Sequence, residues 1–436
     1  MEPASDNSLG LDVYLFPAVV GGGLGDVAEA RDAGRALTEA GFPPLLFRID
    51  DRPLPPVVDR ILEGLQVRKV RAPLRQAARA LTVAPMWGVS AAPARRAPYG
   101  RAGIWAEEAG ALERSYGADG VVHVSLEEFA RHLTSREETI ERYREGGMPI
   151  SEIRRRIASP QGRREVAEFH AAYRLHRALD RPNVLHLYQT FRTSPMFRRE
   201  YPETVQCAPI WPERWARPSG SARRDGRTWV WYASPSTSAR LAPAVLRGLS
   251  GVEPPIDLAV RAGRSDGWPA VPGGVRTDPI PTEEWRREFA SAEMRIVTGS
   301  RTLLEALELG LPFLYFNGTL GSGRSSHRHR PEKIRSLLAA WRDRRVRTAI
   351  LGDLDAFSRG RRVAAVVRRA ATDPRFRRAF GGAGRPVGRD PPWDDGRRLL
   401  VRLAREWASG SESAAALVAR YRRSGPSAPV PRRPAR

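Results

Sequence analysis

The sequence contains one cysteine and only two lysines. A single cysteine, Cys207, excludes an internal disulfide and a metal site built from several thiolates. No apolar run approaches the ~20 residues that a membrane-spanning helix needs. The residues before the first apolar run include no basic side chain, so we expect no signal peptide. These absences fit a cytoplasmic protein without a transmembrane helix.

Negative charge is also scarce, because 49 acidic residues face 72 Lys and Arg and leave a net charge of +23. The basic residues are nearly all arginines, and Ala, Gly and Pro are abundant, which is typical of a GC-rich genome. They are spread along the whole chain, so we expect no dedicated nucleic-acid binding. The positive field still favours anionic ligands, including nucleotide diphosphates, lipid phosphates or the anionic inner face of a membrane.

The length of 436 residues predicts two or three domains. A stretch rich in Arg, Pro, Ser and Gly in the middle of the chain is the best linker candidate. We expect an N-terminal domain over 1–216, with a helical insertion at about 100–180, and the linker over 217–227. A second domain over 228–383, C-terminal helices over 384–423 and a disordered tail over 424–436 should follow.

The first of two informative motifs lies near the N-terminus. Leu11–Val20 is an apolar run of strand length, and a Gly-rich turn and a helical pattern over Val27–Ala40 follow it. Pro44–Ile49 is the next apolar run, so the pattern predicts a parallel strand-helix-strand unit. Glycines let the chain turn sharply and let a ligand approach closely. The spacing is not the dinucleotide fingerprint, because Ala28 stands where a third glycine is required.

The second motif, Val297–Asn317, predicts the end of a strand, a tight turn, an amphipathic helix and another strand. The turn at Gly299-Ser300 leaves backbone N–H groups free at a helix N-terminus, which is a ready anion site. Glu305 lies one turn further on, where a carboxylate can accept the two hydroxyls of a ribose. Gly310-Leu311-Pro312 ends the helix. A strand-helix-strand unit of any Rossmann-like domain is the alternative.

The pattern Gly299-x-x-Thr302-x-x-Glu305, followed by Gly310-x-Pro312, resembles the donor-binding element of GT-B glycosyltransferases. The loop Gly22-Gly23-Leu24-Gly25-Asp26-Val27 resembles the opening loop of glycogen synthases. Its general Gly-Gly-x-Gly shape also resembles the N-acetylglucosaminyltransferase of peptidoglycan lipid synthesis. The resemblance implies an α/β fold of two Rossmann-like, doubly wound parallel-sheet domains facing a cleft, with C-terminal helices that cross back.

The same resemblance implies transfer of a sugar from a nucleotide-diphosphate donor to a hydroxyl acceptor, which could be a lipid, a glycan, a protein or a small molecule. The opening loop, with Gly22, Gly23 and Gly25, would face the acceptor. Ile280 lies in the segment that would pack on the base of the donor. The diphosphate and ribose of the donor would be bound by Gly299, Ser300, Arg301, Thr302 and Glu305.

Retaining enzymes of this fold carry a glutamate where this chain has Val297, so the chain resembles the inverting type, which needs a catalytic base. The candidates are Asp26, His123 at the end of a short strand, and His186 in a buried strand. Asp26 could instead be an acid favoured by the helix dipole, and each histidine a packed side chain. Ser125–Glu128, directly after His123, predicts the opening of a helix.

The sequence shows no ligand set for a metal and implies no cofactor. The resemblance to GT-B enzymes implies that basic groups and helix dipoles neutralise the leaving diphosphate. Two alternatives stay open. One is a nucleotide-sugar epimerase or hydrolase of the same fold. The other is a non-catalytic basic protein, either a nucleic-acid binder or a degenerate GT-B scaffold, whose binding would weaken steeply with salt.

Overall fold

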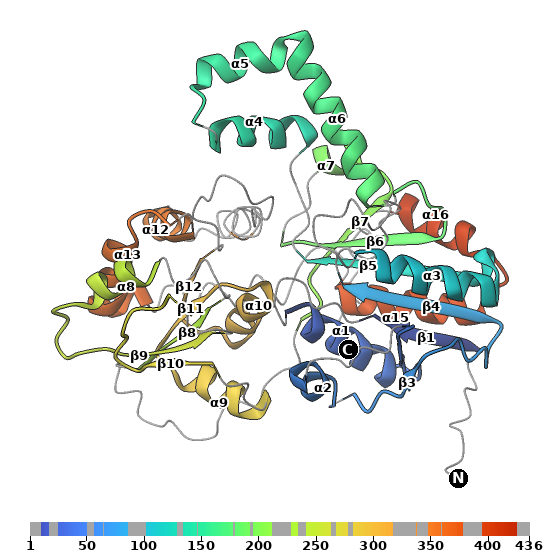
Figure 1. The fold of residues 1–436 in the computed structure, drawn as a ribbon, viewed down its shortest axis with the longest axis horizontal. Helices are drawn as coiled ribbons and strands as arrows, with labels where there is room; N and C mark the ends of the chain where they lie inside the picture. The colour runs from blue at the N-terminus through green and yellow to red at the C-terminus, as the bar shows by residue number, and fades with distance from the viewer. Residues whose placement is uncertain are drawn as a thin grey trace, which may run out of the picture.

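The structure is a computed structural model, and it shows two α/β lobes with a helical arm (Figure 1). It describes residues 10–16, 25–49, 56–63, 65–85, 102–128, 134–145, 147–177, 179–191, 195–211, 228–233, 241–262, 267–277, 282–316, 337, 348–358, 360–377 and 395–424.

The N-terminal lobe contains a seven-stranded sheet in which every strand pair is parallel. Its order is β3-β2-β1-β4-β5-β6-β7. The central strands are buried on both faces, but the two faces differ. On β5, Val122, Val124 and Leu126 join the aliphatic core on one face, and the alternate residues, from His123 to Glu127, are buried polar side chains. The strands are β1 Leu11–Leu15, β2 Leu45–Phe47, β3 Lys69–Val70, β4 Arg79–Pro85, β5 Val121–Glu128, β6 Val184–Gln189 and β7 Thr204–Cys207.

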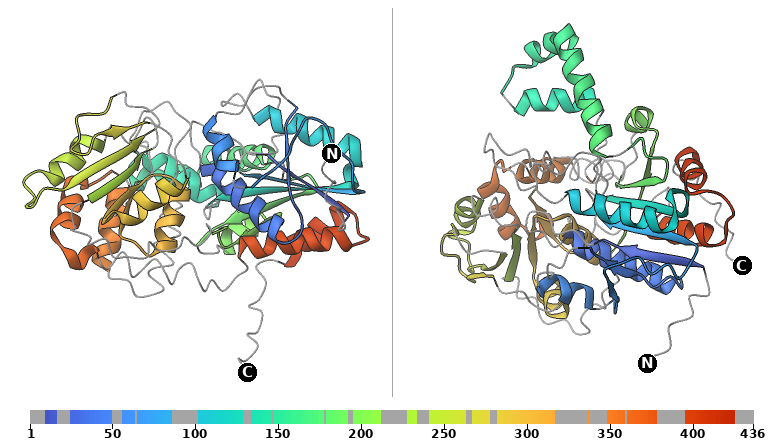
Figure 2. Two further views of the ribbon diagram at one scale, coloured as in Figure 1. Left: turned by 90° about the horizontal axis from the view of Figure 1, so that it is seen from below. Right: turned by 45° about the vertical axis from the view of Figure 1, so that its right-hand side comes forward.

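Helices cover both faces of this sheet, as in a doubly wound fold. One face packs against α1 (Gly25–Glu39), α2 (Pro56–Glu63), α15 (Gly396–Ser409) and α16 (Ala414–Ser424). The other face packs against α3 (Ala102–Tyr116), which precedes the short 3-10 helix η2 (Ala118–Gly120). Figure 2 shows the sheet between these two helical layers.

Within the range predicted for the insertion, α3 and β5 belong to the sheet lobe, and three consecutive helices follow them. They are α4 (Ser135–Glu145), α5 (Ile150–Ala158) and α6 (Pro160–His176). The three helices, which we call the arm, project away from both sheets (Figures 1 and 2). The short helix α7 (Pro195–Glu200) lies at the base of the arm.

The second lobe contains a five-stranded sheet of order β10-β9-β8-β11-β12, again with every pair parallel. Its core is rich in aromatics, and the side chains of Trp229 and Trp231 on β8 are completely buried. The elements of this lobe are β8 Thr228–Ala233, α8 Ala242–Leu249, β9 Asp257–Ala262, β10 Val275–Arg276, α9 Thr282–Ser291, β11 Met294–Val297, α10 Ser300–Leu309, β12 Phe313–Tyr315, α12 Thr348–Ser358 and α13 Val363–Thr372.

The C-terminal helices return to the N-terminal lobe. At the start of α15, the Gly396 N–H donates to the Ala208 carbonyl at 2.9 Å, and a side chain on Gly396 would meet that carbonyl at 2.8 Å. Further along, the Trp407 indole N–H donates to the Ala80 carbonyl at 2.9 Å. The Arg79 guanidinium stacks 4.3 Å from the centre of the Trp407 ring. These contacts fix the helices on the first sheet.

The predicted fold class is confirmed: two Rossmann-like parallel sheets and C-terminal helices that cross back, which is the GT-B arrangement. The domain limits stay a prediction, because residues 212–227 and 378–394 lie outside the described residues. No helix in the described ranges is long and apolar enough to cross a bilayer.

One predicted element is wrong. Ser125–Glu128 is the second half of strand β5, not the opening of a helix, so His123 is the third of eight strand residues and does not end the strand. The Ser-x-x-Glu pattern of Ser125 and Glu128 also fits a strand, and a buried partner permits one here. Glu127 is buried in the sheet, where it forms an ion pair with Arg177 just beyond α6. A buried carboxylate needs such a partner.

Candidate functional site

The N-terminus of α10 has the geometry that the sequence predicts. Strand β11 ends at Val297, and Gly299 caps the helix in an extended conformation with no side-chain capping bond. The first bond inside the helix runs from the Leu303 N–H to the Gly299 carbonyl at 3.1 Å. The N–H groups of residues 300–302 therefore have no partner within the helix. Such a terminus can bind an anion.

Glu305 lies on the same helix but is covered by neighbouring side chains, with only 6% of its surface exposed. Its Oε2 accepts a hydrogen bond from the Trp285 indole N–H at 3.3 Å. Its Oε1 lies 3.6 Å from Nε of Arg301. Burial raises the pKa of the Glu305 carboxyl, and Arg301 opposes that rise only in part.

Arg301 links α10 to helix α1 of the other lobe. Its guanidinium forms an ion pair with Asp32, whose Oδ1 also accepts from Nε of Arg31 at 3.2 Å. Burial lowers the pKa of Arg301 to about 10, although the charge of Glu305 counteracts the change, so Arg301 stays charged at neutral pH. Figure 1 shows α1 and α10 side by side, and their backbones are in contact.

The other donor residues are placed as follows. Thr302 donates its hydroxyl proton to the Gly299 carbonyl at 3.0 Å, so this hydroxyl is engaged within its own helical turn. Ser300 is the first residue of α10, and Gly25 and Asp26 are the first two residues of α1. The side chains of Ser300 and Asp26, and the whole of Gly22, Gly23 and Ile280, lie outside the described part of the chain.

His123 lies in the amino half of β5, level with Thr82 of β4 and Tyr14 of β1, and its ring contacts α3, on the opposite face of the sheet from α1. Its Nδ1 is 2.8 Å from Oγ1 of Thr82, and its Nε2 is 3.0 Å from Oε1 of Glu113. Asn183 donates to the same Glu113 oxygen at 2.8 Å. Burial lowers the pKa of His123, and the carboxylate of Glu113 opposes that shift. His123 therefore takes part in a buried polar network.

His186 is also buried, with 1% of its surface exposed, in the first half of β6. Burial, together with the charges of Arg177 and Arg422, lowers its pKa to about 3, so the ring is neutral at physiological pH. The structure brings neither histidine to the contact between α1 and α10. Of the three candidate bases, only Asp26 begins a helix that reaches this contact.

Two residues of the contact, Asp32 and Trp285, escape the sequence analysis. Asp32 follows Arg31 in α1, between Ala30 and Ala33, both of which are fully buried. A charged pair flanked by small apolar residues was the available signal. Trp285 gave no such signal, because its role depends on how α9 packs beside α10.

The end of β6 also reaches α1. Gln189 donates its side-chain amide to Glu29 on α1 and accepts the Ile210 N–H at 2.6 Å. A polar side chain at the carboxyl edge of the first sheet, Gln189, therefore binds the same helix α1 that contacts α10. Within the described ranges, no group of three or more His, Cys, Asp or Glu side chains is arranged to hold a metal ion.

No protein-family model matches the sequence, and a search of curated proteins finds no match. Among solved structures, the glycotransferase of kitacinnamycin is 13% identical, with a TM-score of 0.45, and the match covers 94% of this chain and 98% of that one. UGT2 of Phytolacca americana, solved with UDP-2-fluoroglucose and pterostilbene, is 10% identical, with a TM-score of 0.46 and coverage of 95% and 98%.

MnaA of S. aureus, solved with UDP, is 10% identical, with a TM-score of 0.48 and coverage of 87% and 92%. All three TM-scores are below 0.5, so the likeness supports no conclusion about the substrate or the activity of this chain.

Proposed function

We propose that this chain is a glycosyltransferase that moves a sugar from a nucleotide-diphosphate donor to a hydroxyl acceptor. One observation carries the proposal: α10 combines three N–H groups free of helical bonds at its start with the carboxylate of Glu305 on the same helix. Glu305 is five residues beyond Ser300, or about 7.5 Å along the axis. A nucleotide whose diphosphate sits at the helix start therefore has its ribose within reach of this carboxylate.

Two buried cations support the same assignment. Arg301 and Arg31 lie beside Glu305 and Asp32 at the contact between α1 and α10. In a site that excludes water, guanidinium groups and helix N–H groups stabilise developing negative charge strongly. They would stabilise the leaving diphosphate without requiring a metal ion.

In the inverting reaction, the acceptor oxygen attacks the anomeric carbon of the sugar. The bond from that carbon to the diphosphate oxygen breaks, and its electron pair leaves with the diphosphate. A base takes the acceptor proton. Asp26, the second residue of α1, is our candidate for the base, and the loop with Gly22, Gly23 and Gly25 is our candidate acceptor surface.

Ribose binding would change the contacts of Glu305. The 3.3 Å bond from Trp285 is long, and Oε1 faces Arg301 at 3.6 Å. Two ribose hydroxyls would give the carboxylate shorter bonds, since a buried carboxylate favours close donors. We expect a ribose hydroxyl to replace the Trp285 N–H as a donor to Glu305. Thr302 would lie near the phosphates of the donor, and Ile280 near its base.

A thermal-shift screen with UDP, GDP, ADP, TDP and CMP tests the proposal. A ligand at about 100 times its dissociation constant stabilises the fold by about 2.7 kcal/mol. We expect a shift selective for one base, lost in Glu305→Ala. The matched control is Glu284→Ala, because Glu284 is an exposed carboxylate on the neighbouring helix α9. Its shift should equal that of the wild type.

Other results would favour the alternatives. Equal small shifts with every nucleotide, unchanged in Glu305→Ala, would indicate only the positive field and a non-catalytic basic protein. Selective binding followed by release of free sugar without an acceptor would indicate a hydrolase, and isomerisation of the donor sugar would indicate an epimerase.

A further inference from the structure

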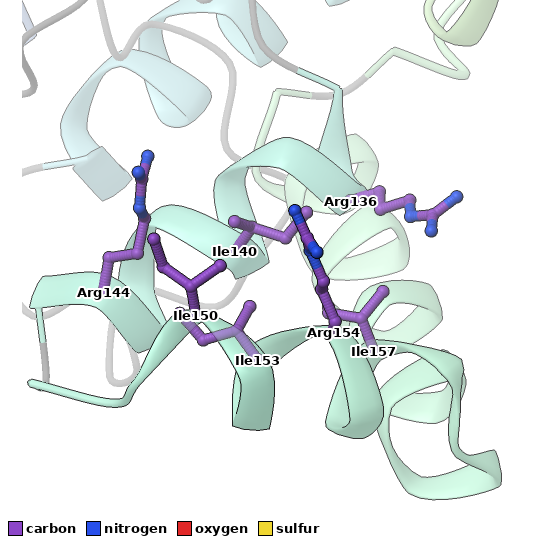
Figure 3. Close-up of a pocket in the computed structure, with 7 residues that line it drawn as sticks. All are labelled: Arg136, Ile140, Arg144, Ile150, Ile153, Arg154 and Ile157. Carbon is purple, nitrogen blue, oxygen red and sulfur yellow. The ribbon is translucent and has the colours of Figure 1, made fainter.

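The distal part of the arm holds an apolar cavity of about 260 Å³ between α4 and α5 (Figure 3). Four isoleucines line it. Ile153 and Ile157 are 3% and 6% exposed, Ile140 is half-buried, and Ile150 is 56% exposed. Pockets for whole small molecules span about 300–1,000 Å³. This smaller cavity therefore suits a few apolar groups of a ligand that lies mostly outside it.

Three arginines line the same cavity: Arg136 and Arg144 from α4, and Arg154 from α5. Arg136 and Arg154 form no ion pair or hydrogen bond with any residue in the described ranges. Other arginines of the arm do have acidic partners, since Arg156 lies 2.6 Å from Glu165. The cavity thus combines an apolar lining with two available cations.

The base of the arm is tied firmly to the N-terminal lobe. The Ser135 N–H donates to Glu200 at 2.9 Å, and the Ser135 hydroxyl lies 2.5 Å from that of Tyr201. Arg174 donates to Glu203 at 2.6 Å. The cavity therefore lies between α4 and α5 of a projection that is tied to the lobe at its base (Figures 1 and 3).

We propose that this cavity and its arginine rim form a groove that binds an acidic amphipathic helix of a partner protein. Apolar side chains spaced at i, i+3 or i+4, and i+7 would enter the isoleucine cavity, as in other helix-in-groove complexes. Glu or Asp residues flanking that stripe would pair with Arg136 and Arg154. Opposite charges at the rim select the partner and speed its association.

Other occupants fit the groove less well. A second copy of the chain would bring arginine rims face to face, and the like charges would repel. Single-stranded nucleic acid needs aromatic platforms, but Tyr143 contacts Glu165 and Phe169 lies under Arg142, and neither lines the cavity. A flat bilayer would reach the exposed Ile150 but not the recessed Ile153 and Ile157.

Fluorescence anisotropy with a labelled synthetic helix tests the proposal on the full chain. The probe is a 16-residue peptide with Leu at the i, i+3, i+7 positions and Glu beside them. A peptide of the same composition, with its leucines spread around the helix, is the control ligand. Arg136→Gln/Arg154→Gln is the test variant, and Arg247→Gln/Arg405→Gln removes the same charge from exposed sites off the arm.

We expect the amphipathic peptide to bind at least tenfold more tightly than its control, and the arm variant to lose at least tenfold while Arg247→Gln/Arg405→Gln retains affinity. Ile150→Ser should also weaken binding, whereas Met196→Ser, at 57% exposure on α7, should not. All six substituted positions are exposed, so the melting temperatures of these variants should equal that of the wild type. Equal binding of both peptides, equal losses in both double variants, or no binding would overturn the proposal. So would arm-dependent binding to vesicles with 30% anionic lipid but not to the peptide.

Discussion

Buried charged side chains in this protein differ in how completely hydrogen bonds and opposite charges compensate their burial. Arg295 on β11 is fully buried, yet it donates to the carbonyls of Phe289 and Ala290, at 2.7 and 3.1 Å, where α9 ends. Glu113 on α3 lies beside the side chains of His123, Asn183 and Arg181. Glu305 accepts one long hydrogen bond, and its nearest cation, Arg301 at 3.6 Å, is also paired with Asp32. An incompletely balanced group of this kind is typical of a binding site.

Glu305→Gln should raise the melting temperature of the ligand-free protein at pH 7. The pKa of Glu305 is raised in the fold, so its ionised form costs stability, and that cost appears as the pH rises above the unfolded value of 4.5. The gain over the wild type should vanish below about pH 4.5. Melting curves from pH 4 to 8 measure it, with the exposed Glu284→Gln as control. A loss of stability at pH 7 would contradict this account.

Glu113→Gln should destabilise the protein at pH 7. Burial would raise the pKa of Glu113, but hydrogen bonds from His123 and Asn183 and the charge of Arg181 outweigh it and lower the pKa to about 2. After allowance for its partial exposure, the loss should be about 1–2 kcal/mol. This stability is present above pH 4.5 and fades as the pH falls towards 2. Urea unfolding should show a smaller difference in unfolding free energy between the wild type and Glu113→Gln at pH 4 than at pH 7.

The helix α10 is the element on which the functional proposal depends, and its length is set by Gly310. This residue has φ +60° in the left-handed region, and the Leu311 N–H bonds back to the Ala306 carbonyl at 3.1 Å. Only glycine adopts this conformation at little cost. The stop places β12 directly after the helix.

Gly310→Ala should therefore cost about 1–2 kcal/mol of unfolding free energy. Gly352→Ala is the matched comparison, because Gly352 is exposed inside helix α12, with open space where the new methyl group would lie. That change should instead stabilise by about 0.5–1 kcal/mol. Chemical denaturation compares the two. A similar loss of unfolding free energy in both variants would show that the left-handed conformation at position 310 does not require glycine.

Elements with a local signal could be predicted from the sequence, and those set by distant partners could not. The strand, turn and helix at 294–310 follow from an apolar run, Gly299 and Gly310. The strand identity of Ser125–Glu128 was missed because Glu127 is balanced by Arg177, about fifty residues away. The burial of Arg295 likewise depends on the end of α9. The Asp32–Arg301 pair joins two lobes, and no local pattern indicates it.

At the scale of the whole molecule, the two lobes meet through charged side chains of α1 and α10. Arg301 and Asp32 are both nearly buried there, with side-chain exposures of 5% and 4%. Without Asp32, Arg301 would keep only the 3.6 Å contact with Glu305. Removing one member of a buried ion pair costs about 3–5 kcal/mol when no other partner replaces it, so we expect a cost of up to this size. The molecule can avoid that cost only by exposing the charge to water, which requires the lobes to separate.

Asp32→Asn should therefore either lower stability by up to that amount or increase the radius of gyration. Unfolding and small-angle X-ray scattering distinguish the two responses. Asp59→Asn is the control, because the pair of Asp59 with Lys69 at 2.7 Å is exposed and should contribute at most about 1 kcal/mol. If both variants behave alike, the α1–α10 pair does not hold the lobes together.

Hydrogen exchange of the full chain, with and without the nucleotide diphosphate selected by the thermal-shift screen, locates the donor site directly. The N–H groups of residues 300–302 have no partner within α10 and should exchange rapidly in the free protein. A bound diphosphate should slow their exchange, together with that of the segment around Glu305, and leave the arm unchanged. Protection of the arm or of scattered Arg-rich segments, with no effect at 300–302, would contradict the proposed donor site.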